Sequence, residues 1–284
     1  MKVAILSDIH GNVAGLRAVI AHIDAWQPDH VILNGDVVNR GPESAACWQI
    51  VQDQRAQHGW QVLGGNHETY VCKHANPVPD AAHRGIQAAI NQNSRWTYKQ
   101  LDGQVAELIN LPSLLELVAP DGSRLRATHA SMRGHSDGIF PAFDQATVAQ
   151  QIAPATAVFV TSHIHVAYVR QVNGTLVVNS GSAGQSGDGD TRASYAQVVW
   201  HKGEWRARIV RLPYDRAATE RAFHDSGFLA ETGPIEQLIY LEWKTAVPLL
   251  PTWRTEYLDS VLAGHLSLEA SVADFLRRHD LRPG

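Results

Sequence analysis

Side chains of the types that bind metal ions follow several short apolar runs of this chain. Eight residues share this placement: Asp8, His10, Asp36, Asn66, His67, His129, His163 and His165. Carboxylate, imidazole and amide oxygen donors suit divalent Mn, Fe, Co, Ni or Zn better than soft Cu(I). The set is larger than one ion needs. It therefore indicates two ions, which roughly 3.5–4 Å apart can hold an attacking hydroxide and clamp phosphoryl oxygens.

The spacing of these residues predicts how they divide between the ions. Asp36 is central in the set and is the natural candidate for a carboxylate that bridges both ions. In an extended segment, residues two apart point the same way, so Asp8 and His10 can share one ion. The same reasoning places His163 and His165 together if their segment stays extended.

The elements that must position these residues alternate between strand and helix in the first part of the chain. Apolar runs predict strands over 2–7, 30–33 and 60–63, and helical patterns cover 13–26 and 43–58. This alternation predicts an α/β fold with parallel strands covered by helices. In such a sheet, ligands bind beyond the carboxyl ends of the strands, so polar residues distant in sequence can converge there.

The rest of the chain is predicted to form an insertion, further strands and a helical extension. Residues 69–110 contain Pro77 and Pro79 and are helical in pattern over 83–108, which indicates an insertion near the site. A helix is predicted at 139–153, and strands at 114–118, 125–129, 157–160, 166–171, 175–179, 194–200 and 205–211. We place a core at 1–214 and a helical C-terminal extension at 215–284. The extension could pack on the core, cover the site or form a dimer contact.

Composition and charge narrow the class of protein. The 284 residues carry a net charge of -4 with no dense Lys/Arg run, which disfavours non-specific nucleic-acid binding but allows a small phosphorylated substrate. Cys47 and Cys72 have neither metal-binding spacing nor the number needed for a disulfide framework. No apolar run approaches the roughly 18 residues of a membrane helix. The N-terminus lacks the apolar segment of a signal peptide. We therefore expect a cytoplasmic protein.

Five ordered sequence blocks resemble the signature of the calcineurin-like metallophosphoesterases. Asp8-Ile9-His10, Gly35-Asp36 and Gly65-Asn66-His67-Glu68 follow one another at gaps of 24 and 28 residues. Thr128-His129 resembles the lone histidine of the family, and His163-Ile164-His165 resembles its H-x-H element. In addition, the segment 179–182, Asn-Ser-Gly-Ser, resembles the N-P-G-S segment of the smaller bacterial and archaeal phosphodiesterases. The resemblance covers residues 1–214.

This resemblance implies a four-layer α-β-β-α sandwich and a two-metal phosphoesterase that hydrolyses a phosphodiester through a metal-bridging hydroxide. It implies that one ion binds Asp8, His10, Asp36 and His165, and the other binds Asp36, Asn66, His129 and His163. By the same resemblance, His67 binds no metal and instead donates a proton, or stabilises charge, at the leaving-group oxygen. We expect Mn or Fe, with Co, Ni and Zn as alternatives.

Arg40 lies in a segment, 35–42, that resembles the G-D-x-x-D-R-G element of the phosphoprotein phosphatases. There the arginine grips the substrate phosphate with two hydrogen bonds. This chain has Asn39 in place of the aspartate, and Lys73 in place of an asparagine of that branch. Arg40 is therefore either a phosphate clamp or a solvated loop residue. As a clamp, it would favour phosphomonoesters, nucleotides or dinucleoside polyphosphates over diesters.

Two further alternatives concern the whole chain and the residues beside the motif. A retromer subunit with this fold acts in protein assembly, so a non-catalytic metal-binding scaffold is the alternative of another class. That alternative predicts degraded ligands, whereas all expected ligands are present. Glu68 is expected to form hydrogen bonds behind the ligands or at a helix start rather than to act in catalysis. We expect no functional role for His74, His83 or His135, and a homo-oligomer could form through the extension.

Overall fold

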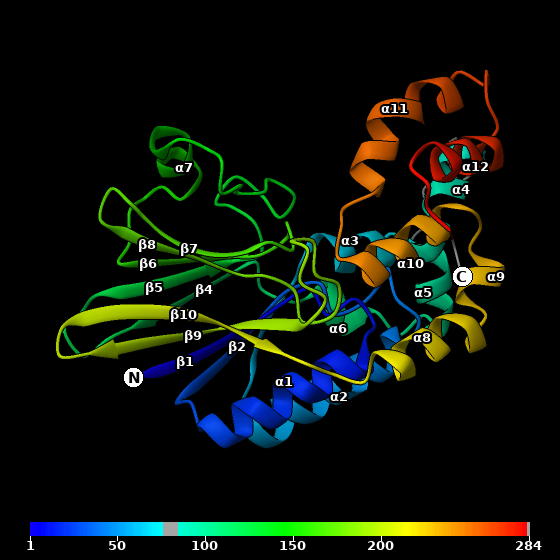
Figure 1. The fold of residues 1–284 in the computed structure, drawn as a ribbon. Coiled ribbons are helices and arrows are strands. Elements are labelled where there is room, and N and C mark those ends of the chain that lie inside the picture. The colour runs from blue at the N-terminus through cyan, green and yellow to red at the C-terminus, as the bar shows by residue number, and fades with distance from the viewer. Residues whose placement is uncertain (76–84, 283–284) are drawn as a thin grey trace.

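The computed structural model of the protein describes residues 1–75 and 85–282. Its centre is a pair of five-stranded mixed sheets (Figure 1). The first has the strand order β10-β9-β1-β2-β3, made of β1 (Lys2–Leu6), β2 (His30–Asn34), β3 (Gln61–Leu63), β9 (Ala193–His201) and β10 (Glu204–Leu212). The second has the order β4-β5-β6-β8-β7, made of β4 (Leu114–Val118), β5 (Arg124–Thr128), β6 (Val158–Thr161), β7 (Ala167–Val172) and β8 (Thr175–Ser180).

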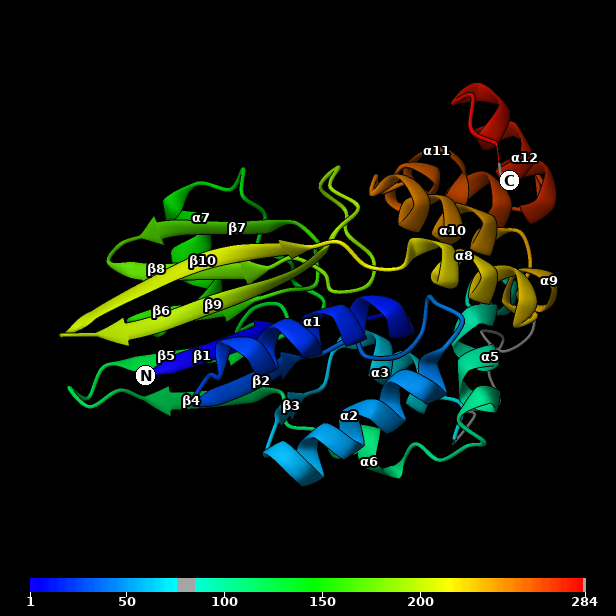
Figure 2. The ribbon, with the colours of Figure 1, turned by 60° about the horizontal axis from the view of Figure 1, so that its bottom comes forward.

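The two sheets pack face to face, and helices cover their outer faces. In β1, Val3 and Ile5 point into the core between the sheets, whereas Ala4 and Leu6 pack beneath α1 (Val13–Trp26) and α2 (Ser44–His58). In β6, Val158 and Val160 face the same inter-sheet core, and Phe159 packs toward α7 (Gln145–Gln151). This alternation follows from the two-residue period of a strand. The predicted four-layer α-β-β-α sandwich is confirmed (Figure 2).

Two of the predicted elements differ in extent from the structure. The helix predicted at 139–153 is α7, which begins only at Gln145. Its start is fixed by Asp144, whose side chain accepts a hydrogen bond of 2.8 Å from the Thr147 N–H, and Pro141 cannot donate a helical hydrogen bond upstream. Of the predicted helix 83–108, the first two residues lie outside the described residues, as do Pro77, Pro79 and His83. The remainder is α4 (Ile86–Ile90), α5 (Gln92–Gln100) and α6 (Ala106–Ile109).

The C-terminal helices form a separate body beside the ends of the strands (Figures 1 and 2). They are α8 (Arg216–Asp225), α9 (Phe228–Glu231), α10 (Ile235–Thr245), α11 (Leu250–Leu262) and α12 (Leu268–Arg278). Their own apolar core includes Trp253 and Phe275, and it extends to Ile90 of α4. The extension therefore packs together with the helices of the 69–110 segment. We refer to α4, α5 and α8–α12 as the helical body.

The helical body also bonds directly to the loops of the sandwich. Thr219 Oγ1 of α8 donates to Asn12 Oδ1 at 3.0 Å, and the Gly189 N–H donates to the Ala246 carbonyl at 2.9 Å.

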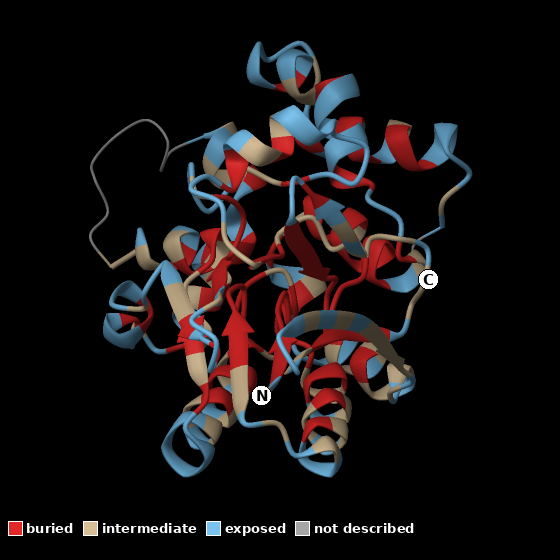
Figure 3. Cartoon of the chain, turned by 90° about the vertical axis from the view of Figure 1, so that its left-hand side faces the viewer, coloured by how far each residue is buried: buried red, intermediate tan, exposed pale blue. Residues whose placement is uncertain are grey.

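Figure 3 shows that buried residues concentrate in the strands and that the outer faces of the helices are exposed. Over the described part of the chain, no helix has the length and apolar character needed to cross a membrane.

Candidate metal centre

Most of the predicted ligands lie in loops that leave the carboxyl ends of the strands, and Asn66 begins the helix that follows β3. β1, β2 and β6 each end two residues before one of these ligands, namely Asp8, Asp36 and His163, respectively. All three ligands have left-handed backbone conformations, with φ of 52°, 56° and 69°, and His10 and His165 share this feature. Aspartate and histidine are among the non-glycine residues that tolerate this region. The chain therefore turns sharply out of the sheet at each ligand.

This geometry corrects one step of the sequence analysis. The D-x-H and H-x-H segments are not extended, so strand geometry does not explain the grouping of Asp8 with His10, and the condition for His163 and His165 to share one ion is not met. Asp8 and His10 do lie in one cluster, but His163 and His165 lie in different clusters. The turn at each left-handed residue, and not the strand period, decides where the side chains point.

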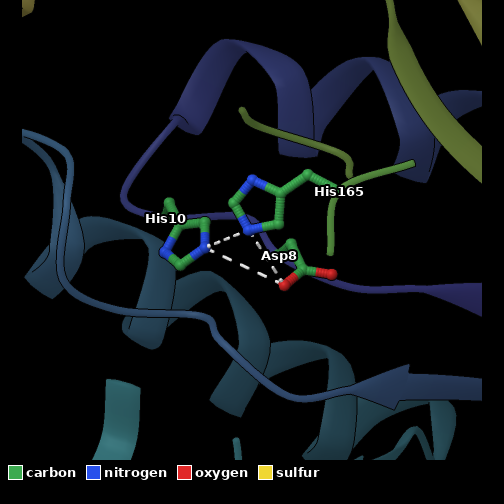
Figure 4. A group of neighbouring side chains, drawn as sticks. All are labelled: Asp8, His10 and His165. Carbon is green, nitrogen blue, oxygen red and sulfur yellow. Dashed lines mark hydrogen bonds and ion pairs between the residues drawn. The ribbon is translucent and has the colours of Figure 1, made fainter. Parts of the chain in front are cut away.

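The first cluster joins Asp8, His10 and His165 (Figure 4). The Nε2 atoms of the two histidines are 3.0 Å apart, and Asp8 Oδ1 is 3.3 Å from that of His165 and 3.9 Å from that of His10. Figure 4 shows the two imidazole nitrogens and the carboxylate oxygen converging on one point. Three donor atoms at this spacing can coordinate one divalent ion.

The second cluster joins Asp36, His129 and His163, with Asn66 beside them. His129 Nε2 lies 3.2 Å from Asp36 Oδ2 and 3.1 Å from Asn66 Oδ1. His163 Nδ1 lies 2.8 Å from the same amide oxygen. The structure therefore brings these four predicted ligands of the other ion together.

Asp36 lies between the two clusters. Its Oδ2 atom is 3.7 Å from His10 Nε2 in the first cluster and 3.2 Å from His129 Nε2 in the second. Its other oxygen accepts the His67 backbone N–H at 2.9 Å, which holds the carboxylate in place. Glycine is required beside it, because a Cβ on Gly65 would lie 2.1 Å from Asp36 Oδ1.

The donor set fits two divalent cations. Asp36 Oδ2 and Asp8 Oδ1 are buried and have no hydrogen-bond partner in the protein. A buried carboxylate oxygen without a partner is strongly unfavourable unless a cation or a donor satisfies it. The negative charge of the Asp36 carboxylate also affects the pKa of His129. Burial alone would lower its pKa, but the Asp36 carboxylate raises the pKa of His129 to about 10. The same potential attracts a metal ion.

Backbone carbonyls orient two of the histidine ligands. His129 Nδ1 donates to the Asn34 carbonyl at 2.7 Å, and His10 Nδ1 donates to that of Asn39 at 3.2 Å. In a neutral ring, this places the proton on Nδ1 and leaves the Nε2 lone pair directed at the centre. The arrangement fixes the tautomer that a metal ligand needs.

Glu68 holds the loop that carries Asp36. Its carboxylate accepts the backbone N–H groups of Asp36, Val37, Val38 and Gly65 at 2.8–3.2 Å. The expectation of a hydrogen-bonding role is confirmed. Burial raises the pKa of Glu68 to about 7, and the nearby Asp36 carboxylate acts in the same direction. Four donors on one buried side chain make this residue the main support of the left-handed turn.

His67 lies close to both clusters, in the first turn of α3 (Asn66–Cys72). Its ring lies 4.8 Å from that of His10, and one of its nitrogens lies within 4.8 Å of ligand atoms of His10 and Asp36. However, Nδ1 lies 2.9 Å from the Asn39 amide nitrogen, which can only donate. The proton of the neutral ring therefore resides on Nε2, and this nitrogen can donate a hydrogen bond. Burial lowers the pKa of His67 to about 3, so the ring is neutral at pH 7.

Arg40 is partly buried and bonded to side chains from distant parts of the chain, so it is not a solvated loop residue. Its Nη2 forms an ion pair with Glu242 of α10, and Nε donates to Gln185 Oε1 at 2.9 Å. Glu242 is itself held by the backbone N–H groups of Leu249 and Leu250, each at 2.7 Å. A guanidinium has five N–H groups, so these two bonds leave other N–H groups of Arg40 available to a phosphate, but the Glu242 carboxylate neutralises its charge. The sequence analysis missed this link because Glu242 belongs to no motif.

A cavity of about 1280 Å³ opens beside His67. Its walls come from α3, α4, α5, α10 and α11 and include Asn66, His163, Tyr70, Lys73 and Arg254. His74 also lies in this wall, with Nε2 2.9 Å from Ser94 Oγ, and it belongs to none of the metal-ligand groups of the described residues. The sequence analysis did not single out Tyr70 or Arg254, since neither follows a strand or matches a family motif.

Comparison with known proteins gives one family match. Residues 1–203 match the model of the calcineurin-like phosphoesterase superfamily domain. The match includes all eight strand-end residues identified from the sequence, and most of the helical body lies beyond it.

Similar proteins come from bacteria and archaea. An uncharacterised protein of Methanocaldococcus jannaschii is 25% identical over 236 residues, covering 75% of this chain and 88% of that protein. A crystal structure of a metallophosphoesterase from Sphaerobacter thermophilus has a TM-score of 0.64 at 24% identity, covering 87% of this chain and 99% of that one. A hypothetical protein of Pyrococcus horikoshii OT3 has a TM-score of 0.70 at 16% identity, covering 81% and 95%. These structures share the fold.

Proposed function

We propose that this chain, which belongs to the calcineurin-like phosphoesterase superfamily, hydrolyses a phosphodiester at a centre of two divalent metal ions. The observation that carries the proposal is the position of Asp36. Its unpartnered Oδ2 lies between the histidine Nε2 atoms of two separate ligand clusters. A carboxylate in this position suits a bridge between two ions. Intact ligands in both clusters favour an enzyme over a protein-interaction scaffold.

The protein residues have distinct tasks in this proposal. Asp8, His10, Asp36 and His165 would hold one ion, and Asp36, Asn66, His129 and His163 would hold the other. When bound, the two ions would supply an activated water for in-line attack on phosphorus and neutralise the charge of the phosphoryl oxygens. His67 would lie at the leaving oxygen, where its Nε2–H donates a hydrogen bond as the P–O bond breaks.

Arg40 favours a diester over a monoester as the substrate. A phosphomonoester dianion presents an additional charged oxygen, which an unpaired arginine would bind well. The guanidinium of Arg40 is instead neutralised by Glu242. A diester carries one negative charge and has less need of such a clamp. The segment Asn179-Ser180-Gly181-Ser182, similar to that of small phosphodiesterases, supports the same choice.

Hydrolysis assays with controlled metal content test the proposal. The protein would be stripped with chelator, supplied with Mn, Fe, Co, Ni, Zn or Mg, and assayed with bis-p-nitrophenyl phosphate and p-nitrophenyl phosphate. We expect metal-dependent turnover with a higher kcat/KM for the diester. The absence of turnover with every metal would contradict the enzyme, and a higher kcat/KM for the monoester would contradict the diester preference.

A further inference from the structure

The cavity beside His67 is larger than the hydrolysed phosphate group requires. At about 1280 Å³ it exceeds the roughly 300–1,000 Å³ typical of small-molecule sites. It begins at Asn66, His67 and His163 and extends between α5 of the 69–110 segment and α11 of the C-terminal extension. It therefore has room for a substrate that reaches well beyond the metal centre.

The described walls of this cavity carry positive charge only. Five cationic side chains line it, namely Arg40, Lys73, Arg95, Lys99 and Arg254, and no aspartate or glutamate is among the described lining residues. This distribution is unexpected for a chain with 24 basic and 28 acidic residues. A cleft lined by one sign of charge concentrates the electric field and attracts ligands of the opposite sign.

Four of these cations also lack carboxylate partners. Elsewhere on the surface, Arg211 pairs with Asp188, and Lys244 pairs with Glu220. Arg40 pairs with Glu242. In contrast, no ion pair within the described residues involves the other cations of the wall, which are Lys73, Arg95, Lys99 and Arg254. They come from the C-terminal cap of α3, from α5 and from α11, so three separate parts of the chain place cations without carboxylate partners around one cavity.

A row of side chains along α3 and its C-terminal cap leads from the candidate metal centre to one of these cations. The His67 and Tyr70 rings are 5.2 Å apart, and Lys73 Nζ lies 5.6 Å from the centre of the Tyr70 ring. Residues three apart share one face of a helix, which explains the row. The Tyr70 ring is partly exposed in the cavity wall. A leaving group placed at His67 would thus pass an aromatic ring and then reach a cation.

We propose that the substrate carries at least one phosphate group in addition to the one hydrolysed, and that this group binds the unpaired cations of the cavity, Lys73, Arg95, Lys99 and Arg254. The inference rests on the proposed function, because it assigns the leaving-group side of the substrate to this cavity. The ligand class is a phosphate ester or anhydride of several negative charges. Its extra phosphate can belong to a nucleotide chain or to a polyphosphate bridge.

A matched pair of substrates tests this inference. The dinucleotide ApA and its 5′-phosphorylated form pApA differ by one phosphate group. On the metal-loaded wild-type chain, we expect kcat/KM for pApA to exceed that for ApA by about tenfold or more, since a hydrogen bond to a charged group is worth such a factor. A dinucleoside tetraphosphate assayed alongside identifies which of the two phosphate sources gains more. Equal kcat/KM values for ApA and pApA, with no gain for the tetraphosphate, would overturn the inference.

Charge-reversal variants localise the effect. In Lys73→Glu and Arg254→Glu, the ratio of kcat/KM values for pApA and ApA is expected to fall toward one. Lys202→Glu, in the exposed turn between β9 and β10, makes the same change in net charge away from the cavity and should keep the wild-type ratio. Raising the salt from about 50 mM to about 200 mM should shrink the wild-type advantage. A ratio that survives both reversals would contradict the assigned cations.

A binding measurement separates this inference from the proposed function. Failure to hydrolyse bis-p-nitrophenyl phosphate and both dinucleotides would count against the enzyme alone. Calorimetric titration of the same full-length chain with pApA and ApA then decides the phosphate site. We expect the phosphorylated dinucleotide to bind about tenfold more tightly, and binding of equal affinity would overturn the inference.

Discussion

The strand-end loops of the sandwich and the helical body differ in how they contribute to the site. The loops carry buried ligands in left-handed turns, supported by backbone hydrogen bonds such as those to Glu68. The helical body contributes exposed cations and apolar side chains to the cavity wall, from segments far apart in sequence. The loops hold the candidate metal ligands close together, whereas the wall presents positive charge that favours anionic ligands. We therefore propose that the sandwich determines the reaction and that the cavity wall determines the substrate.

Removing the negative charge of Asp36 should strongly lower the rate of hydrolysis of every substrate. Asp36→Asn keeps the shape of the side chain but weakens the attraction for both ions. We expect kcat to fall about 10³-fold or more for every substrate, because the ions supply several kcal/mol of transition-state stabilisation. Steady-state kinetics with measured metal content checks this. Asp24→Asn, an exposed position on α1, is the control, and an equal loss there would contradict the specific role of Asp36.

The effect of losing the His67 side chain on kcat should depend on the leaving group. In His67→Ala, we expect about a 10²-fold fall in kcat for a dinucleotide, whose alkoxide leaving group needs a proton. The fall should be much smaller for bis-p-nitrophenyl phosphate, since p-nitrophenolate leaves without protonation. Parallel assays with the two substrates make this comparison. The same loss for both would indicate that His67 binds metal or supports the fold instead.

Weakening the hydrogen bonds that Glu68 accepts from the Asp36 loop should lower metal affinity without changing the cavity wall. Glu68→Gln replaces one acceptor oxygen by a donor facing backbone N–H groups. We expect metal affinity to fall about 10- to 100-fold, as is typical for residues that orient ligands. Metal titration of the chelated protein measures this affinity, with the exposed Glu107→Gln as the matched control. Unchanged affinity would show that the turn at Asp36 holds without Glu68.

The smallest expected effect concerns the ion pair between Arg40 of the sandwich and Glu242 of the helical body. Glu242→Gln removes the charge that neutralises Arg40. If the released guanidinium grips phosphate, kcat/KM for a monoester should rise several-fold relative to a diester, by about 1 kcal/mol. Glu220→Gln, whose partners Lys244 and Tyr240 both lie within the helical body, should leave this ratio unchanged. A ratio unchanged in both variants would make Arg40 a structural link only.

The sequence predicted the first region far better than the second. Apolar runs located the strands, and the order of Asp8, Asp36 and His129 indicated candidate ligands that the structure brings together, because polar residues at strand ends converge at one edge of a sheet. The left-handed turns were missed, since hydrophobic periodicity carries no information on φ.

Long-range pairs in the wall could not be predicted at all. Arg40 and Glu242 are 202 residues apart, and their contact depends on how the helical body packs. The sequence motif predicts a phosphate clamp or a solvated residue at Arg40, and its ion pair with the buried Glu242 carboxylate is a third arrangement. The cavity cations such as Lys73 and Arg254 likewise become neighbours only through tertiary packing.

The most direct test of the central claim is to locate the ions. Crystals of the manganese-loaded protein would be measured for anomalous scattering, and dissolved protein would be assayed for metal per chain. We predict two ions per chain, one at Asp8, His10 and His165 and one at Asn66, His129 and His163, with Asp36 contacting both. A single ion, or ions bound away from these residues, would contradict the two-metal account.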